Sequence, residues 1–157
     1  MKEKKIEIKM VEVQYDELTD RQRKLVDLAR AATDRSYAPY SKFRVGAAIE
    51  LDNGEIVTGS NQENAAYPSG TCAERTAAFY AHATYPDAKF KAIAIAAIGT
   101  DGCEVGDPVA PCGACRQSLL EFETLAKHDV EVILVGSEAI YILPSIKSTL
   151  PLAFSEF

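Results

Sequence analysis

Thr71-Cys72-Ala73-Glu74-Arg75 and Pro111-Cys112-Gly113-Ala114-Cys115 are two short segments that hold three of the four cysteines of this chain. Three thiolates can bind a zinc ion, which prefers four tetrahedral ligands. A structural zinc site takes all four ligands from the protein, whereas a catalytic site takes three and leaves the fourth position to water. No fourth ligand stands at motif spacing, since the remaining candidates are isolated: Cys103, His82 and His128. The pattern therefore predicts one catalytic zinc per chain, bound by Cys72, Cys112 and Cys115, with Glu74 moving the protons of its water.

The spacing of these residues fits the start of two helices. Cys112 and Cys115 are three residues apart and would share one helix face, while Pro111 suits a helix entry, where its missing N–H is not needed. The positive end of a helix lowers the pKa of a thiol and stabilises the thiolate. Residues two apart on a helix point roughly 200° away from each other. Cys72 should therefore lie at the cap or in the first turn, so that both it and Glu74 reach the metal.

Two arginines beside the motifs bear on the charge of the site. Zinc with three thiolates carries a formal negative charge, which weakens its activation of water. Arg75 and Arg116 directly follow Glu74 and Cys115, and we expect one or both to donate to cysteine sulfurs and withdraw charge. The plainer alternatives are surface arginines, a structural zinc, or a redox Cys-x-x-Cys pair. The third cysteine and the upstream glutamate favour the catalytic site.

Composition restricts the partners of the chain. A length of 157 residues with 47% hydrophobic content suits one well-packed domain. The net charge of −6 and the pI of about 5.0 disfavour nucleic acid and anionic membranes as partners. No apolar run approaches the ~20 residues of a membrane helix. The charged N-terminus is not followed by the apolar stretch that a signal peptide requires, so we expect none here. We expect a cytoplasmic protein whose thiols are reduced and available to metal.

Hydrophobic periodicity predicts alternating helices and strands. Helices are expected at Thr19–Arg35, Cys72–His82 and Cys112–Lys127. Strands are expected at Val45–Leu51, Glu55–Gly59, Lys91–Ile98, Val130–Val135 and Ile140–Leu143, and Asp52-Asn53-Gly54 is a strong hairpin signal between the first two. Ile6–Val13 alternates and suggests an edge strand or an extended arm, and the tail 144–157 should be irregular with one helical turn. The order predicts an α/β fold, a three-layer α/β/α sandwich with a mixed sheet of about five strands.

These motifs, with several others in the same order, closely resemble the cytidine deaminase family, the tetrameric zinc enzymes of pyrimidine salvage. The matching segments are Tyr37–Phe43, Val45–Ala48, Asn61–Tyr67, Cys72–Thr76, Pro111–Gln117 and Leu150–Phe154. The resemblance makes residues 1–157 a single deaminase domain with its core at about 19–154. An N-terminal extension of about residues 1–15 and the loop around Cys103 depart from the family pattern.

The resemblance also implies an activity, the hydrolytic deamination of cytidine and 2′-deoxycytidine to the uridines with release of ammonia. A zinc-activated water would attack C4 of cytosine, while Glu74 accepts its proton, protonates N3 and later protonates the departing ammonia. The residues implied to bind substrate are Phe43, Asn61, Glu63, Ala73 and Phe154. Asn61 and Glu63 would bind the ribose 3′-hydroxyl and Phe43 would stack on the pyrimidine. Phe154 would come from a neighbouring subunit of a homotetramer with shared active sites, and Tyr67 is expected at the same interface.

Three other functions remain open on the sequence. A deaminase of modified cytosine nucleosides, such as the blasticidin S deaminases of the same family, would share the metal site. A non-catalytic, zinc-stabilised binding module would not need Glu74. Deamination of nucleic acid would need a basic groove with interleaved aromatic residues, and the sequence shows neither.

Overall fold

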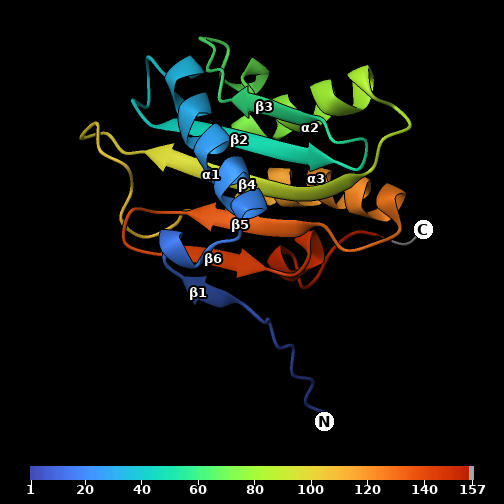
Figure 1. Cartoon of the computed structure of the whole chain (residues 1–157). Helices are drawn as coiled ribbons and strands as arrows, with labels where there is room; N and C mark the ends of the chain where they lie inside the picture. The colour runs from blue at the N-terminus through green and yellow to red at the C-terminus, as the bar shows by residue number, and fades with distance from the viewer. Residues whose placement is uncertain (156–157) are drawn as a thin grey trace.

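A mixed sheet of six strands organises the computed structural model, which describes residues 1–155. The strands are β1 (Val11–Val13), β2 (Arg44–Leu51), β3 (Ile56–Ser60), β4 (Phe90–Ile98), β5 (Glu131–Val135) and β6 (Ile140–Leu143). They lie in the order β1-β6-β5-β4-β2-β3; β4 and β5 run parallel, and the other neighbours are antiparallel (Figure 1). The sheet has one strand more than the approximate five that the sequence predicted. The sixth strand is β1, the last part of the alternating segment Ile6–Val13, whose first five residues form no strand.

Helices cover both faces of the sheet, which confirms the predicted three-layer α/β fold (Figure 1). Helix α1 (Asp20–Ala32) packs on one face, and α2 (Ala73–Thr84) and α3 (Gly113–Ala126) pack on the other. Alternate residues of β4 enter the two hydrophobic layers, because successive side chains of a strand point to opposite faces. Ile93 and Ile95 contribute to the core under α2 and α3, and small alanines contribute to the layer under α1.

Local signals set several element boundaries where the sequence predicted them. Thr19 caps α1 and exchanges hydrogen bonds with Gln22 in a capping box. The β2–β3 hairpin turns at Asn53-Gly54, where Gly54 has a φ of 88° that favours glycine. Asn53 Oδ1 accepts a hydrogen bond from the backbone N–H of Glu55. The helical turn expected in the tail is the 3-10 helix η4 (Ile146–Thr149); the tail residues 156–157 lie outside the described part of the chain.

Two glycines allow helices to approach the sheet closely. A Cβ at Gly46 of β2 would lie 2.2 Å from the carbonyl oxygen of Ala29 in α1. A Cβ at Gly59 of β3 would lie 2.5 Å from the backbone nitrogen of Ala77 in α2. Both contacts are with backbone atoms, which cannot move aside cheaply. The second one fixes α2 against the hairpin and so helps to position the start of α2, where Cys72 lies.

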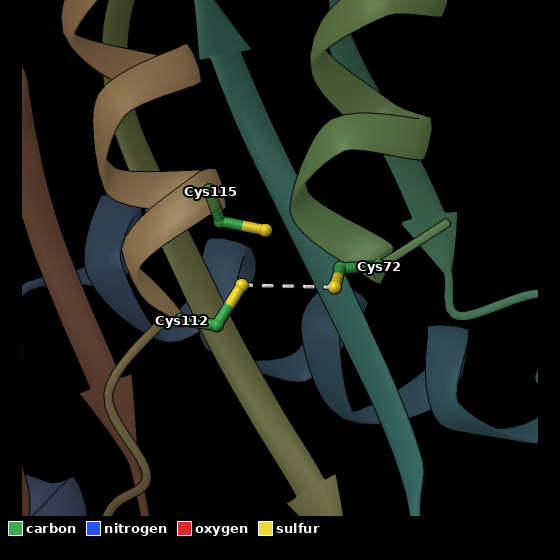
Figure 2. Close-up of side chains that lie close together, drawn as sticks. All are labelled: Cys72, Cys112 and Cys115. Atoms are coloured by element: carbon green, nitrogen blue, oxygen red, sulfur yellow. Dashed lines mark hydrogen bonds between the residues drawn. The ribbon is translucent and has the colours of Figure 1, made fainter. Parts of the chain in front are cut away.

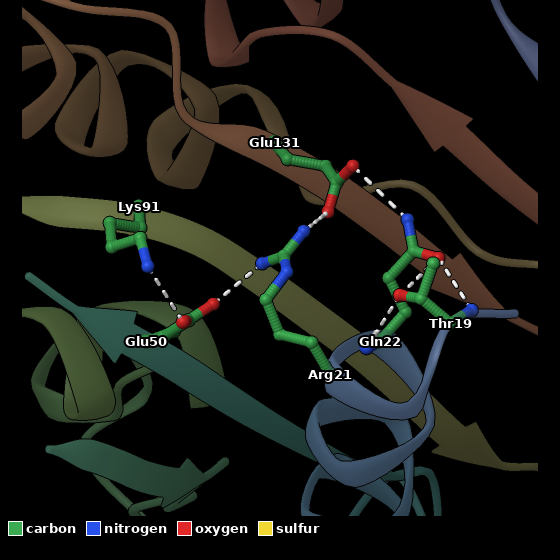
Figure 3. A network of polar contacts seen from close by, with 6 residues as sticks. All are labelled: Thr19, Arg21, Gln22, Glu50, Lys91 and Glu131. Carbon is green, nitrogen blue, oxygen red and sulfur yellow. Dashed lines mark hydrogen bonds and ion pairs between the residues drawn. The ribbon is translucent and has the colours of Figure 1, made fainter. Parts of the chain in front are cut away.

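A polar network ties α1 to the sheet at the N-terminal end of the helix. Figure 3 shows Arg21 between two carboxylates, with its guanidinium 2.6 Å from Glu50 and 2.5 Å from Glu131. Lys91 of β4 adds a second cation 3.1 Å from Glu50. Three neighbouring strands are thereby linked to one helix residue. Among residues 1–155, no helix combines the length and the apolarity required to cross a bilayer.

Candidate active site

The three motif cysteines converge at the starts of two adjacent helices (Figure 2). Cys72 is the N-cap residue of α2 and Cys112 the N-cap residue of α3, both with extended backbone. Cys115 follows in the first turn of α3 and is fully buried. The cap position of Cys72 agrees with the geometric requirement derived from its spacing to Glu74. Both helix N-termini thus direct their positive ends toward the sulfur cluster.

The cluster has the donor chemistry and dimensions of a zinc site. All three Sγ atoms lie within 4.8 Å of one another, and those of Cys72 and Cys112 are 3.9 Å apart. A tetrahedral ion with Zn–S bonds of about 2.3 Å separates its sulfurs by about 3.8 Å. Among residues 1–155, this is the one group of three or more histidine, cysteine or acidic side chains that could hold a metal ion. Cys103 lies apart in an exposed loop. The cluster therefore fits zinc with one position left open.

Interactions within the cluster favour a thiolate at Cys72. Hydrogen bonding from Cys115, with further help from Arg75, lowers the pKa of Cys72 to about 5. The same hydrogen bond, together with burial and the nearby Glu74 carboxylate, raises the pKa of Cys115. Cys115 therefore keeps its proton until a cation replaces it, because metal binding requires the deprotonated ligand.

Glu74 lies in the first turn of α2, where its carboxyl group interacts with Cys72 and Cys115. Its side chain is buried, with a relative exposure of 4%. Burial, and to a lesser extent the negative charge of Cys72, raises the pKa of Glu74 above its ordinary value. A raised pKa makes the carboxylate a better proton acceptor than an ordinary glutamate, which favours a role in general acid–base catalysis.

The two arginines beside the motifs have different partners. Arg75 donates from Nη2 to Cys72 Sγ at 3.7 Å, and its Nε is buried without a hydrogen-bond partner among the described residues. Arg116 instead donates to two carbonyl oxygens, those of Pro111 at 2.6 Å and Thr149 at 3.0 Å. Of the two expected sulfur donors, the structure places Arg75 on the cluster, whereas carbonyl groups at the helix start and in η4 occupy Arg116.

A cavity of about 440 Å³ opens beside Cys72. Its lining residues are Tyr40, Ser41, Asn61, Gln62, Glu63, Asn64, Tyr67, Gly70, Thr71, Cys72 and Arg75. The cavity thus joins the expected ribose-binding pair to the edge of the sulfur cluster. Its volume lies within the range typical of small-molecule sites.

Backbone N–H groups hold the Glu63 side chain in place as a hydrogen-bond acceptor at this cavity. Its carboxylate accepts hydrogen bonds from the backbone N–H groups of Tyr40 at 2.8 Å and Ser41 at 3.3 Å. Hydrogen bonding by Ser41, with support from Tyr40, lowers the pKa of Glu63. Glu63 is therefore ionised near neutral pH and keeps lone pairs for a hydroxyl donor.

Asn61 has a structural task beside its expected binding role. Its Oδ1 accepts from the backbone N–H of Val45 at 2.8 Å, and its Nδ2 donates to the carbonyl oxygen of Phe43 at 2.9 Å. The amide therefore fixes the start of β2. One N–H and one lone pair remain for a ligand.

The other expected substrate residues do not line the cavity within the described chain. Ala73 is buried at the start of α2. Phe43 is half-buried and adjoins the cavity through its backbone contact with Asn61. Phe154 is exposed and lies on α3 of its own chain, where Gln117 holds its backbone.

Two residues without a role in the sequence analysis hold other parts of the chain against α3. Gln117 lies two positions after Cys115 and clamps the tail at Phe154. Glu123 is a buried carboxylate that accepts from three backbone N–H groups, those of Val130, Ile146 and Lys147. Gln117 stood inside a quoted motif, but nothing in local spacing pointed to Glu123, whose partners lie up to 24 residues away.

Fold and site together define a zinc-dependent hydrolytic enzyme, with three convergent cysteines, a buried glutamate and an adjoining cavity. The sequence model of the cytidine and deoxycytidylate deaminase zinc-binding region matches residues 19–128. A cytidine deaminase of Halalkalibacterium halodurans is 38% identical over 131 residues, which cover 83% of this chain and 92% of that protein. One from Sporosarcina psychrophila is 46% identical over 99 residues, covering 63% of this chain and 68% of that protein.

A solved structure agrees with these sequence matches. The crystal structure of cytidine deaminase from Burkholderia pseudomallei is 38% identical and superimposes with a TM-score of 0.71, covering 87% of this chain and all of that one. The chain belongs to the cytidine deaminase family, whose known reaction is the zinc-dependent deamination of cytidine.

Proposed function

We propose that this chain, as a single domain, deaminates cytidine and 2′-deoxycytidine in pyrimidine salvage and works in the cytoplasm. The observation that carries this proposal is the position of the cavity, which reaches from Asn61 and Glu63 to Cys72. A nucleoside spans such a site with its ribose at one end and its base at the other. The ionised Glu63 favours a neutral nucleoside over a nucleotide, because a 5′-phosphate would bring a second negative charge into the same cavity.

Cys72, Cys112 and Cys115 would hold the zinc, which supplies Lewis-acid activation of a water molecule when bound. Glu74 accepts a proton from the attacking water and delivers it to N3 of the cytosine ring. The same carboxyl group then takes the second proton of that water, now on the hydroxyl at C4, and transfers it to the amino group; the C4–N bond breaks, ammonia leaves and the C4 oxygen becomes the carbonyl of the uracil ring. Burial of Glu74 supports both steps, because its raised pKa brings proton release and uptake closer to neutral pH.

The remaining residues orient the nucleoside. Glu63 accepts a hydrogen bond from the ribose 3′-hydroxyl, and the free N–H of Asn61 donates to the same oxygen. Ala73 lies between Cys72 and Glu74, where its backbone faces the base. Phe43 contacts the pyrimidine after a side-chain adjustment on binding.

The active unit is a homotetramer with shared sites. Phe154 and Tyr67 are both exposed, at 70% and 78%, and both are aromatic residues whose burial against a neighbour would favour assembly.

Arg75 withdraws charge from the thiolate cluster through its contact with Cys72.

The test is a comparison of Glu74→Gln with Glu121→Gln, a matched change at an exposed glutamate of α3. Both variants should bind one zinc per chain, and only Glu74→Gln should lose turnover of cytidine, by roughly two orders of magnitude or more. An unchanged rate in Glu74→Gln would reject the proposed mechanism. A substrate panel of cytidine, 2′-deoxycytidine, deoxycytidylate and a modified cytosine nucleoside, followed by ultraviolet loss, separates the nucleoside reading from its rivals.

A further inference from the structure

The N-terminal segment extends edge strand β1 away from the body of the protein (Figure 1). Residues 1–10 are all exposed and belong to no strand within the described chain. They also lie outside the family match, which begins at residue 19. Residues 4–10 of this segment are called the arm below. Neither the proposed site nor the proposed reaction uses it.

The arm has no strand to pair with inside its own chain because β6 ends too early. The β1–β6 register pairs Val11 with Ile142 and Val13 with Ile140. Continuing this register would bring the arm beside Pro144, which lacks an N–H and cannot extend a ladder. The chain turns there into η4. Within the described residues no strand pairs with the arm, so its backbone donors and acceptors are open to another strand.

The arm nevertheless has the side-chain pattern of a strand. From residue 6 onward its even-numbered residues, Ile6, Ile8 and Met10, are apolar and half-exposed or more, at 56%, 52% and 50%. Its odd-numbered residues Lys5, Glu7 and Lys9 are charged. Lys5 and Glu7 form an ion pair of 2.6 Å, as residues two apart do on one face of an extended chain. An apolar stripe on an isolated, solvated arm is unfavourable unless something covers it.

We propose that the arm and β1 pair antiparallel with the same segment of a second copy of this chain, across a two-fold axis at Ile8. This register places opposite one another the pairs Lys4 with Glu12, Ile6 with Met10, Glu7 with Lys9, and Ile8 with itself. The apolar stripes meet on one face of the new ladder, with the Lys4–Glu12 pairs at its two ends, and Glu7 meets Lys9 on the other face. Lys5, which faces Val11 in this register, keeps Glu7 of its own strand.

Other registers lose this match. A shift by one residue sets the apolar stripe against the charged side of the second copy. Centring on Glu7 or Lys9 puts like charges directly opposite each other, which is destabilising. Centring on Ile6 places Ile8 opposite Lys4 and Met10 opposite Lys2. Complementarity of charge and apolarity thus selects a second copy of this chain in one register.

The pairing joins two sheets edge to edge. Strand β1 is the last strand of the sheet, so its outer edge is open to another strand. Lysines on an edge strand usually prevent such pairing, but here every lysine of the arm has a glutamate within reach. The contact is isologous, because the same segment serves both copies. It is separate from the cavity and the sulfur cluster, so it can form whether or not the enzyme is active.

A disulfide test reads the register directly. In a Cys103→Ser background with zinc bound, Ile8→Cys should form a disulfide-linked dimer, because paired residues in a ladder have Cα atoms about 4.5–5.5 Å apart. Ile6→Cys is the matched control, with the same residue type and face but no self-partner. Pairing holds two thiols at an effective concentration near millimolar, so Ile8→Cys should cross-link at least about tenfold faster than Ile6→Cys in micromolar protein. A mixture of Ile6→Cys and Met10→Cys should give the heterodimer.

Charge exchange tests the opposite face. In the Ile8→Cys protein, Lys9→Glu should slow cross-linking by roughly 2- to 10-fold, since two glutamate pairs then face each other. Adding Glu7→Lys restores the opposite charges and should restore the rate. Equal cross-linking of Ile8→Cys and Ile6→Cys would overturn the proposal, as would a slow rate in the double exchange. The first result means that the arm is unpaired or pairs in another register, and the second that the facing charges are not those named.

Discussion

Gln117 holds Phe154 by both of its backbone groups. The side-chain Nε2 of Gln117 donates to the carbonyl oxygen of Phe154 at 2.7 Å, and its Oε1 accepts from the N–H of Phe154 at 3.2 Å. Gln117 lies on the same helix as Cys112 and Cys115. The tail is thereby fixed to the helix that carries two of the candidate zinc ligands, and the position of Phe154 follows the position of that helix.

Removing this clamp should affect catalysis through Phe154. In Gln117→Leu the tail loses two hydrogen bonds, and we expect a higher KM for cytidine with zinc content unchanged. Phe154→Ala should give a similar loss. If Gln117 acts by placing Phe154, the double variant should be no worse than the more severe single one. Steady-state kinetics of the three variants measures this, and fully additive losses would show that the two residues act independently.

Arg75→Gln should retain zinc but lower activity and move the pH–rate profile to higher pH. We expect the guanidinium, which donates to Cys72 Sγ, to withdraw negative charge from the cluster, so that its loss makes the attacking water harder to deprotonate. Arg116→Gln is the control, because Arg116 contacts carbonyl oxygens rather than sulfur. That variant should alter stability without shifting the profile. An unshifted profile in Arg75→Gln would contradict charge withdrawal by this residue.

Glu123→Gln should destabilise the protein by about 2 kcal/mol or more. The buried carboxylate accepts from three backbone N–H groups, and an amide offers one oxygen and brings N–H groups of its own. Glu121→Gln, exposed on the same helix, should change stability by no more than about 0.5 kcal/mol. Urea unfolding of both variants gives the comparison. Equal stabilities would mean that the three N–H groups find other acceptors.

The network around Arg21 should make stability depend on acid pH. Burial opposes ionisation of Glu50, but hydrogen bonds from Arg21 and Lys91 outweigh it and lower the pKa of Glu50 from 4.5. A lowered folded-state pKa contributes stability that is present above pH 4.5 and is lost as the pH falls through the folded value. Arg21→Gln should therefore cost roughly 1 kcal/mol near neutral pH, and this difference should shrink in acid below pH 4.5.

Arg23→Gln controls for loss of an arginine from α1. Its partner Asp20 is 98% exposed, so that ion pair should contribute little. Thermal unfolding at neutral and acid pH measures both variants. A difference between Arg21→Gln and the parent that stays constant with pH would contradict the linkage to Glu50.

Local chemistry explains why most elements were predictable. The capping box at Thr19, the Asn53-Gly54 turn and the helix starts at Cys72 and Cys112 each depend on residues within a few positions of one another. The sulfur cluster was predictable because a zinc ion requires protein ligands that converge on one point. These features needed no knowledge of the tertiary structure.

Long-range contacts explain what the sequence did not reveal. The length of β1 depends on where β6 ends, and the role of Glu123 depends on backbone groups of η4. The acceptors of Arg116 include a carbonyl oxygen 33 residues away. No periodicity or motif encodes such partners, because each arises only when segments distant in the sequence pack together.

The Sγ atoms of Cys72 and Cys112 approach to 3.9 Å although 40 residues separate them in the chain. A zinc ion bound by both would close this loop in the folded state only, so it would stabilise the fold by its own binding free energy and not by restricting the unfolded chain. Unlike a disulfide, this closure opens with a chelator and re-forms on metal addition. The shelf life of the purified enzyme should therefore track metal handling as closely as temperature.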